Sequence, residues 1–347
     1  MPIFKPRSRD GFALPAVLAV TGVVTLIFLV AMTALHSLTT EAASARARVR
    51  FLQRAMTAEA QIAFLAATQP MKPFGLSIND TRSAADLGDT SFEPRPLGLD
   101  VEQLWLDGRP YRLDMDQPLL VRLKDEAGML NLTSLDMTTH QRFLQALGVE
   151  PRQVQGLIAR YYDYMDTDDQ RRADGAERAD YGAAQPTNRR LMRPQEYLSI
   201  LGMRESVDAK RWRRLAPDLT ANGTNTAFNV NTASRTALAL RLGLTEPQID
   251  AVIRQREESP FQIQSQLQAV TGLVLGDQFE TVLTFPSGAF YFNLHDSQSA
   301  WTYRGRIILT PVSAEQPIWI DQFALTEAPK RAAANINDAP RLPTPTR

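Results

Sequence analysis

The chain has 347 residues, 44% of them hydrophobic, and its 38 basic residues balance 38 acidic ones to a formal net charge of zero. This length and composition suffice for two or three domains with a sizeable core, and the balanced charge excludes a broad attraction to nucleic acid or anionic lipid. The absence of cysteine excludes disulfides and thiolate sites, and three widely separated histidines, His36, His140 and His295, argue against a histidine-rich metal centre or a Ser-His-Asp triad. We therefore expect no enzymatic activity.

An uncharged stretch follows a basic leader at the N-terminus. Lys5, Arg7 and Arg9 precede Gly11, and no charged residue occurs from Phe12 to Leu35. At about 1.5 Å of rise per residue this stretch forms about 36 Å of helix, which is enough to cross the hydrocarbon core of a membrane. It is longer than the apolar region of an ordinary secretory signal, so we expect it to remain as an anchor.

The predicted helix continues beyond the membrane to about residue 66. Apolar residues recur there at spacings of three and four, as they do on one face of a helix. This stripe comprises Phe51, Ala55, Ala58, Ile62 and Leu65. Pro70 and Pro73 follow the end of the helix, and the accumulation of Gly, Asn, Asp and Pro from 75 to 96 predicts a loop.

Alternation of apolar and polar residues predicts strands in two separate places. A hairpin is expected between 111 and 123, and three further β-rich runs cover 289–294, 301–309 and 317–325. Together these strands are expected to form one antiparallel sheet packed on the anchor helix. The residues between them, from about 126 to 285, have a mainly helical pattern, so we interpret them as a large insertion into a small α+β domain.

An internal repeat occurs within this insertion. Residues 131–134 precede a turn at Gly148, residues 229–232 precede a matching turn at Gly243, and an apolar helix follows each turn. We interpret the repeat as two helix-turn-helix units. In each unit the Asn, Thr or Ser residues suit helix N-caps, and the glycine suits the end of a helix where φ is positive.

The second repeat is similar to the helix-hairpin-helix of DNA-binding proteins, through residues 229–233 and the later residues 254–257. In those proteins a Gly-x-Gly turn lets backbone amides approach a phosphate. Here Thr245 stands in place of the second glycine, and Glu150 adds negative charge beside the turn of the first repeat. The sequence therefore favours a structural protein-binding module, and DNA binding stays open as the alternative.

An acidic stretch separates the two repeats, from Asp163 to Tyr181. Four carboxylates take places one, three, nine and twelve of a twelve-residue window, as the oxygen ligands of an EF-hand loop do: Asp166, Asp168, Asp174 and Glu177. Gln170 and Arg171 break the rest of that pattern, so the stretch is not an EF-hand. Clustered carboxylates repel one another unless a cation relieves them. Two interpretations stay open: a hard divalent cation, for which Ca²⁺ is the best candidate, or neutralisation by Arg171, Arg172 and Arg178.

The junction between leader and anchor resembles the cleavage site of type IV prepilins and pseudopilins. In that family a membrane peptidase cuts after the glycine, which implies cleavage between Gly11 and Phe12. The family usually carries glutamate at the fifth residue after the cut, where this chain has Ala16, and the next acidic residue is Glu41. Because that glutamate neutralises the N-terminal amine of the adjacent subunit, a subunit without it suits the tip of a filament. The alternative is an uncleaved signal anchor.

An ordered series of motifs resembles the minor pseudopilin K family of type II secretion systems. Besides the leader, the motifs are Asp125 to Leu132, Asp163 to Tyr181, Arg193 to Met203 and Asn229 to Ala233. The resemblance implies a large α-helical domain inserted into a pilin fold, a calcium-bearing loop, and a position at the pseudopilus tip with the minor pseudopilins I and J. By position it implies a set of metal ligands, led by Asp166, Asp168 and Glu177 and followed by Asp163, Asp169 and Asp174. Arg178 departs from the acidic residue that is common after that glutamate.

The predicted fold class is α+β and pilin-like. A long N-terminal transmembrane helix packs on a small antiparallel sheet, which carries a large inserted all-α domain with two helix-turn-helix repeats. The predicted segments are a cleaved cytoplasmic leader (1–11), the N-terminal helix (12–66, transmembrane over 12–35), a loop with the first strands (67–125), the inserted helical domain (126–285), the last strands (286–325) and a flexible tail (326–347).

The predicted function is that of a non-enzymatic minor pseudopilin. It would nucleate or cap the pseudopilus tip with the I and J types, for export of folded proteins across the outer membrane. Prepilin peptidase would process and N-methylate it. The chain would cross the bacterial inner membrane once, with its N-terminus in the cytoplasm and its bulk in the periplasm, and would bind no nucleic acid. The alternative is a membrane-anchored helix-hairpin-helix DNA-binding protein of the competence type.

Overall fold

The computed structural model describes residues 13–79, 102–182, 186–222, 228–273, 284–296, 300–310, 315–327 and 335–345. The predicted processing site, Gly11 and Phe12, lies outside these residues. The chain divides into two compact units, Met1–Arg54 and Ala55–Arg347. Helix α1 (Ala13–Thr68) contributes to both units.

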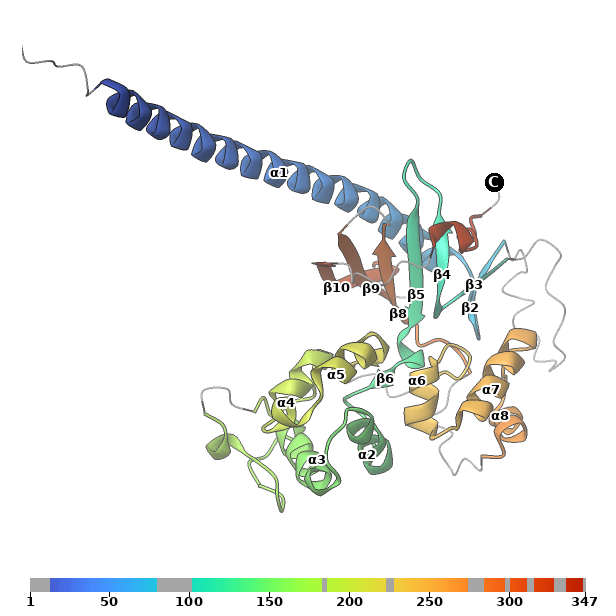
Figure 1. The fold of residues 1–347 in the computed structure, drawn as a ribbon. Coiled ribbons are helices and arrows are strands. Elements are labelled where there is room, and N and C mark those ends of the chain that lie inside the picture. The colour runs from blue at the N-terminus through green and yellow to red at the C-terminus, as the bar shows by residue number, and fades with distance from the viewer. Residues whose placement is uncertain are drawn as a thin grey trace, which may run out of the picture. The chain divides into compact units, whose positions relative to one another are not determined.

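In the first unit, the large apolar side chains of α1 are exposed, and Leu14 and Phe28, for example, are 72% and 66% exposed. Thr21 and Thr25 donate their hydroxyls to backbone carbonyls one turn earlier, at 2.8 Å each, so neither hydroxyl is unsatisfied in an apolar medium. Among the described residues, α1 is the one helix long and apolar enough to cross a membrane (Figure 1). The chain therefore has the long apolar N-terminal helix that its sequence predicts.

The last turns of α1 belong to the second unit and bury most of the predicted apolar stripe. Four stripe residues there are at most 3% exposed, namely Ala55, Ala58, Ile62 and Leu65. Phe51, just before them, is also buried. Glu59 accepts a hydrogen bond of 2.7 Å from the hydroxyl of Tyr303. The helix ends at Thr68 because Pro70 has no backbone N–H and disfavours helical geometry in the residue before it.

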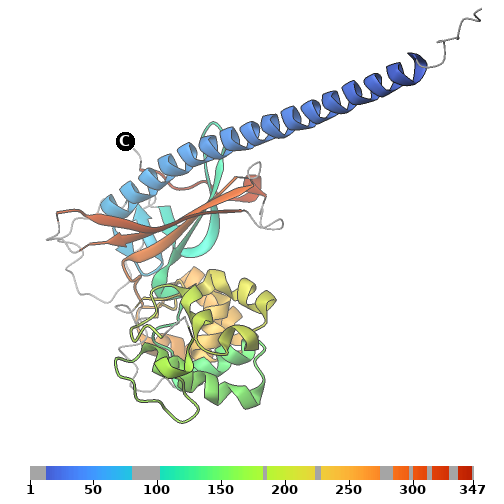
Figure 2. The ribbon, with the colours of Figure 1, turned by 90° about the vertical axis from the view of Figure 1, so that its left-hand side faces the viewer.

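A five-stranded antiparallel sheet is the central element of the second unit (Figures 1 and 2). Its order is β10-β9-β8-β5-β4, and its strands are β4 (Asp107–Leu113), β5 (Leu119–Asp125), β8 (Ala289–His295), β9 (Trp301–Leu309) and β10 (Ile318–Glu327). The prediction of one antiparallel sheet from a hairpin and three distant strands is confirmed. One face of the sheet contributes residues that are 0% exposed, namely Val121, Leu123, Phe292, Leu294 and Ile307. In Figure 2 the end of α1 and the helices that follow β5 lie on opposite sides of this sheet.

The predicted loop from 75 to 96 is wrong at its beginning. Gly75–Ile78 forms strand β2, which pairs with β1 (Met71–Lys72) and β3 (Glu102–Trp105) in a three-stranded sheet. The remainder of the predicted loop lies mostly outside the described residues. Glycine is uncommon within strands, but here it is required, because a β-carbon added to Gly75 would lie 2.2 Å from the carbonyl oxygen of Leu104. All four residues of β2 are buried, so close packing of the strands decides this element.

The chain between β5 and β8 is mainly helical in its described residues (Figure 1). The helices are α2 (Met137–Ala146), α3 (Pro151–Met165), α4 (Met203–Ser206), α5 (Ala209–Leu215), α6 (Arg235–Ala237), the π-helical turn η6 (Leu238–Leu242), α7 (Glu246–Glu258) and α8 (Gln264–Thr271). Short 3-10 turns are η2 (Glu126–Gly128), η3 (Arg178–Asp180), η4 (Pro194–Ser199), η5 (Ala216–Asp218) and, near the C-terminus, η7 (Ile336–Asp338). A parallel pair that the sequence did not predict joins β6 (Leu130–Asn131) to β7 (Leu219–Thr220).

Two apolar cores form among the described residues of this helical segment. One gathers buried residues between Leu130 and Ala221 together with Leu240, and the other gathers residues between Phe228 and Leu267. Each core encloses one of the two repeats. Whether residues 126–285 as a whole are an independent domain stays a prediction.

Two helix-turn-helix units occur where the repeat predicts them. Gly148 has φ 84° between α2 and α3, and Gly243 has φ 69° between η6 and α7. The positive φ at each glycine is confirmed. The predicted N-caps are wrong, because Asp136 caps α2 and Ser234 caps α6 with their side chains. The Asn and Thr residues that precede these caps have other hydrogen-bond partners.

The Asn and Thr residues of the second repeat join the helical segment to the sheet. Asp125, the last residue of β5, is fully buried. Its carboxylate accepts hydrogen bonds from Asn229 Nδ2 at 3.1 Å and from Thr232 Oγ1 at 2.6 Å. It also accepts one from the backbone N–H of Ser287 at 3.0 Å. A single buried carboxylate therefore holds both ends of the helical segment, because Asp125 ends β5 and Ser287 lies two residues before the start of β8.

Gly128 lies at the same junction. A β-carbon added there would be 2.6 Å from the carbonyl oxygen of Thr232. The glycine is therefore needed for the backbone of η2 to approach residues 229–233. Two of the sequence motifs that carry the family resemblance thus contact each other directly.

Candidate metal centre

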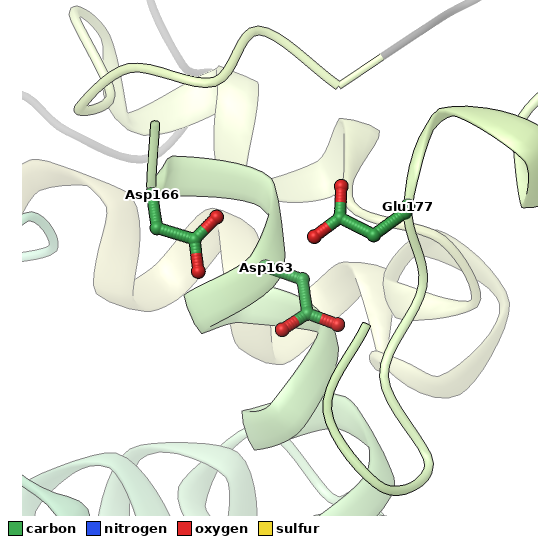
Figure 3. Close-up of side chains that lie close together, drawn as sticks. All are labelled: Asp163, Asp166 and Glu177. Atoms are coloured by element: carbon green, nitrogen blue, oxygen red, sulfur yellow. The ribbon is translucent and has the colours of Figure 1, made fainter. Parts of the chain in front are cut away.

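Three of the predicted acidic residues lie together at the end of α3. Oxygen atoms of Asp163, Asp166 and Glu177 all lie within 4.8 Å of one another. Asp163 and Asp166 come from the last turn of α3 and its C-cap, whereas Glu177 comes from the loop that follows (Figure 3). The sequence places the first two three residues apart, so they share one side of the helix.

Gly175 allows the loop to return to α3. Asp163 is fully buried, and a β-carbon added to Gly175 would lie 1.9 Å from its Oδ2 atom. Asp174, just before this glycine, has φ 61°, which turns the chain sharply. Ala176 is then 1% exposed within the first helical core. The close approach of the loop to the helix brings Glu177 to the other two carboxylates.

Arg172 neutralises two of these carboxylates. Its Nη1 atom donates to Oδ1 of Asp163 at 2.6 Å and also to Oδ2 of Asp166. Its backbone N–H donates to Oδ2 of Asp163 at 3.2 Å. The hydrogen bonds to Asp166 and Asp163 raise the pKa of Arg172. Of the three arginines that the sequence offered, Arg172 is the one that reaches the cluster.

The other two arginines lie elsewhere. Arg171 pairs with Asp180 at 3.4 Å, and Arg178 is exposed. The sequence alone does not distinguish Arg171 and Arg178 from Arg172, because all three arginines lie in one loop. Which arginine reaches the carboxylates depends on the path of the loop after α3.

Glu177 has a different environment from the two aspartates. It is 5% exposed, and neither of its carboxylate oxygens has a hydrogen-bond partner in the described part of the chain. The same holds for Oδ1 of Asp166. Burial raises the pKa of the Glu177 carboxyl, and the nearby carboxylates, Asp163 first, raise it further. A buried carboxylate without donors is costly, so this group requires either a proton or a cation.

The donor set fits a hard cation. It contains carboxylate oxygens and no nitrogen or sulfur ligand, which suits Ca²⁺ or Mg²⁺ and not zinc or copper. Three oxygens without hydrogen-bond donors, two on Glu177 and one on Asp166, are available to such an ion.

The remaining predicted ligands lie outside this group of three. Oδ1 of Asp168 accepts from the backbone N–H of Gln170 at 2.8 Å, and Oδ1 of Asp169 accepts from Nδ2 of Asn188 at 3.2 Å. Asp174 is exposed and contributes the turn described above. The twelve-residue spacing therefore predicts a single loop but not which carboxylates converge. The metal itself stays a prediction.

Comparison with known proteins agrees with the family resemblance. Residues 120–224 match the family model for type II secretion system (T2SS), protein K. The type II secretion system protein K of Pseudomonas aeruginosa is 31% identical over 163 residues, which are 44% of this chain and 49% of that protein. The match thus spans about half the length of this relative.

A solved structure has a similar fold. One chain from the crystal structure of the GspK-GspI-GspJ complex from the enterotoxigenic Escherichia coli type 2 secretion system matches with a TM-score of 0.54 and 16% identity. The match covers 82% of the present chain and 99% of that chain. It supports a pilin-like fold with both helix and antiparallel sheet. These matches agree with the resemblance predicted from the sequence motifs, and residues 120–224 are similar to protein K of type II secretion systems.

Proposed function

We propose that the chain is a non-enzymatic minor pseudopilin of a type II secretion system. It is anchored in the bacterial inner membrane by α1 and has its bulk in the periplasm. It nucleates or caps the pseudopilus tip together with minor pseudopilins of the I and J types. One observation carries this proposal: the match of residues 120–224 to protein K covers β5 and the first part of the helical segment that lies between β5 and β8 of a pilin-like sheet.

The tip position follows from two features of the chain. Ala16 offers no carboxylate to the N-terminal amine of a neighbouring subunit, so this chain lacks a contact that would repeat along a filament. The inserted segment also adds bulk to a small sheet, which obstructs regular stacking of identical subunits. Both features are compatible with one copy at an end.

α1 offers a contact surface beyond its membrane-spanning part. Met56 and Phe64 are 62% and 58% exposed, although the opposite side of the same helical turns is buried. Large apolar side chains that remain exposed in this way are typical of a protein interface. We propose that this outer side of α1 packs against the N-terminal helices of the other minor pseudopilins.

The experiment is co-purification of the full chain with I- and J-type minor pseudopilins of the same organism, followed by native mass determination in detergent. The expected result is a complex of defined, low stoichiometry. The double variant Met56→Gln, Phe64→Gln should form a weaker complex. Its melting temperature should not fall, since both side chains are exposed. Gln61→Ala, on an exposed position of the same helix, is the matched control. A chain that never co-purifies with these partners would refute the proposal.

We also propose that Asp163, Asp166 and Glu177 bind Ca²⁺ as a structural ion. The support is the convergence of three carboxylates and the absence of hydrogen-bond donors to Glu177 in the described residues. The ion would join α3 to the loop that returns to it. Asp168, Asp169 and Asp174 lie outside this trio, so they would contribute only if the loop rearranged around the ion.

DNA binding of the competence type is disfavoured by the second repeat. The guanidinium group of Arg142 covers Gly243, where an added β-carbon would be 3.1 Å from Cζ. The backbone N–H of Thr245 donates to Oε1 of Gln248 at 2.9 Å. Nη1 of Arg142 also donates to the carbonyl oxygen of Leu240 at 2.5 Å, so a phosphate at this turn would meet a guanidinium and an amide that are both already engaged within the protein. A gel-shift assay with duplex DNA at about 0.15 M salt should show no specific complex, and tight binding there would favour the competence-type protein.

A further inference from the structure

A cleft separates the sheet from the helices α5 and η5. It consists of two adjoining cavities of about 440 Å³ and 320 Å³, which share Gln195, Ala216, Tyr291 and Arg304 in their walls. Among the described residues that line it, five are basic and none is acidic: Arg122, Lys124, Arg193, Arg213 and Arg304. We call it the arginine cleft. This imbalance is local, because the whole chain has equal numbers of basic and acidic residues.

Strand register places two of these arginines on the same face of the sheet. Arg122 of β5 pairs with Asn293 of β8, which pairs with Arg304 of β9. Residues directly opposite each other on neighbouring strands share one face, so the three form a row across three adjacent strands. At about 4.8 Å between strands, the backbones of the two arginines are about 10 Å apart.

The arginines in this row have no carboxylate partner among the described residues. Arg304 lies over the ring of Tyr291, with Cζ 4.4 Å from the ring centre, and Arg122 donates to the carbonyl oxygen of Gly108 at 3.0 Å. In contrast, Lys124 is paired with Asp218. Burial lowers the pKa of both Arg122 and Arg304, which reflects the cost of holding these charges away from water.

Arg213 adds a cation from the helical side of the cleft. In the described structure it donates to the carbonyl oxygen of Ala209 and to no carboxylate. Its neighbour in sequence, Arg214, is also exposed but does not line the cleft. The two walls therefore direct unpaired guanidinium groups into one space.

A bound anion would neutralise these charges. The distance between the basic side chains indicates which kind of anion fits. Guanidinium groups bind carboxylates through paired hydrogen bonds. The cations are spread over two adjoining cavities, so one phosphate cannot reach all of them, whereas carboxylates spaced along an extended chain can. Gln195 and Asn293 are exposed amides in the same walls, and amide groups suit a peptide backbone. We propose that the arginine cleft binds a carboxylate-rich peptide segment of a partner protein. This proposal does not depend on which protein supplies the segment.

The test uses the full chain in a non-ionic detergent and a fluorescein-labelled (Glu-Gly)4 peptide, with binding followed by fluorescence anisotropy in about 0.15 M NaCl. Saturable binding is expected, and the matched (Gln-Gly)4 peptide should not bind. Arg213→Gln should weaken binding about tenfold, because it removes charge-assisted hydrogen bonds. Arg214→Gln, at the adjacent position of the same helix, should leave the affinity unchanged.

Two variants of the sheet complete the test. Arg304→Gln should also weaken binding about tenfold, and Arg304→Lys should weaken it less, because the charge stays but the planar fork is lost. Tryptophan fluorescence melts check that each variant is folded. Arg304→Gln carries the greater risk of misfolding, whereas Arg213 is exposed, so the comparison of Arg213 with Arg214 decides the question in either case.

Three outcomes would overturn the proposal. The first is equal affinity of the Arg213 and Arg214 variants for the peptide. The second is complete displacement of the peptide by an equal concentration of inorganic phosphate, which would indicate a site for a small anion. The third is binding of dihexanoylphosphatidylglycerol, but not of the peptide, in a manner that depends on Arg213, which would indicate a lipid headgroup site.

Discussion

Nη1 of Arg172 donates a hydrogen bond of 2.6 Å to Oδ1 of Asp163, a carboxylate that is completely buried at the end of α3. The same guanidinium pairs with Asp166. Glu177, the third member of the cluster, receives no such donor from the described residues. The protein therefore neutralises two of the three carboxylates and leaves the third to a cation or a proton.

Calcium should stabilise the protein through this cluster. An ion that binds only the folded state at about 100 times its dissociation constant adds about 2.7 kcal/mol, so millimolar Ca²⁺ should raise the melting temperature relative to EDTA. Glu177→Gln should remove most of this response. In EDTA the same substitution should raise the melting temperature, because it replaces a buried charge that has no donor. Thermal melts of the detergent-solubilised chain with EDTA or with CaCl₂ measure both effects.

Asp168→Asn is the control for that experiment. Asp168 lies outside the cluster, and asparagine can still accept the hydrogen bond from Gln170, so the calcium response should persist. If Asp168→Asn abolishes the response and Glu177→Gln does not, the ligand set is wrong. A wild-type melting curve that ignores both chelator and calcium would favour neutralisation by Arg172 alone.

Gly175→Ala should destabilise the loop that carries Glu177. The added β-carbon would lie 1.9 Å from Oδ2 of Asp163, and neither the buried carboxylate nor the backbone can move freely. We expect a loss of about 1–3 kcal/mol in the free energy of unfolding, together with weaker calcium binding. Gly182→Ala is a matched control, because its β-carbon would have no neighbour within 4 Å. Urea unfolding curves that coincide for the two variants would contradict this account.

His140 should make the protein sensitive to acid. Burial lowers its pKa to about 3, although Asp136 opposes this shift, and its Nε2 lies 2.6 Å from the hydroxyl of Tyr197. The unfolded chain binds a proton near pH 6.5 and the folded chain does not. This contribution to stability is therefore complete above pH 6.5 and is lost as the pH falls toward 3, at up to about 1.4 kcal/mol per pH unit.

The measurement is the free energy of unfolding in urea at pH 7.5 and pH 4.5. Wild type should lose more stability between these values than His140→Gln, which cannot gain the proton. Carboxylates with lowered pKa, such as Asp107, also lose stability in acid, but they do so equally in both proteins. Equal losses in the two proteins would show that His140 does not titrate in this way.

Asp125→Asn should loosen the junction between the sheet and the helical segment. Asparagine keeps the size of the side chain but turns an NH₂ group toward donors on Asn229, Thr232 and Ser287. We expect a loss of about 2–4 kcal/mol in the free energy of unfolding. Asp116→Asn, outside this junction on the turn between β4 and β5, should change little. A small effect of Asp125→Asn would mean that other contacts hold the two parts together.

Gly11→Val should block processing of the N-terminus. A side chain next to the scissile bond would obstruct the approach of the peptidase to the backbone. In membranes that contain active prepilin peptidase, intact-mass analysis should find wild type beginning at Phe12 and the variant beginning at Met1. Unprocessed wild-type protein under these conditions would instead indicate a retained signal anchor.

Several elements of this protein follow from local patterns in its sequence. The uncharged run after Gly11 predicts a long apolar helix, period-two alternation predicts four of the five strands closely and the fifth in outline, and Gly148 and Gly243 mark the helix ends. These patterns suffice because each reflects a property of residues that are close in sequence. The apolar helix reflects the transfer of apolar side chains from water, the strands reflect the alternating direction of side chains in a pleated strand, and the glycines reflect their ability to adopt positive φ.

Only the tertiary structure decided the rest. The contact between Asp125 and Thr232 joins residues 107 positions apart, and no local pattern indicates that one carboxylate would hold both ends of the helical segment. The same reason explains why Gly75 lies in a strand, why Arg172 and not Arg171 reaches Asp163, and why Arg122 and Arg304 share one face of the sheet. Each depends on which distant backbone the chain approaches, because hydrogen bonding and burial act between neighbours in space and not between neighbours in sequence.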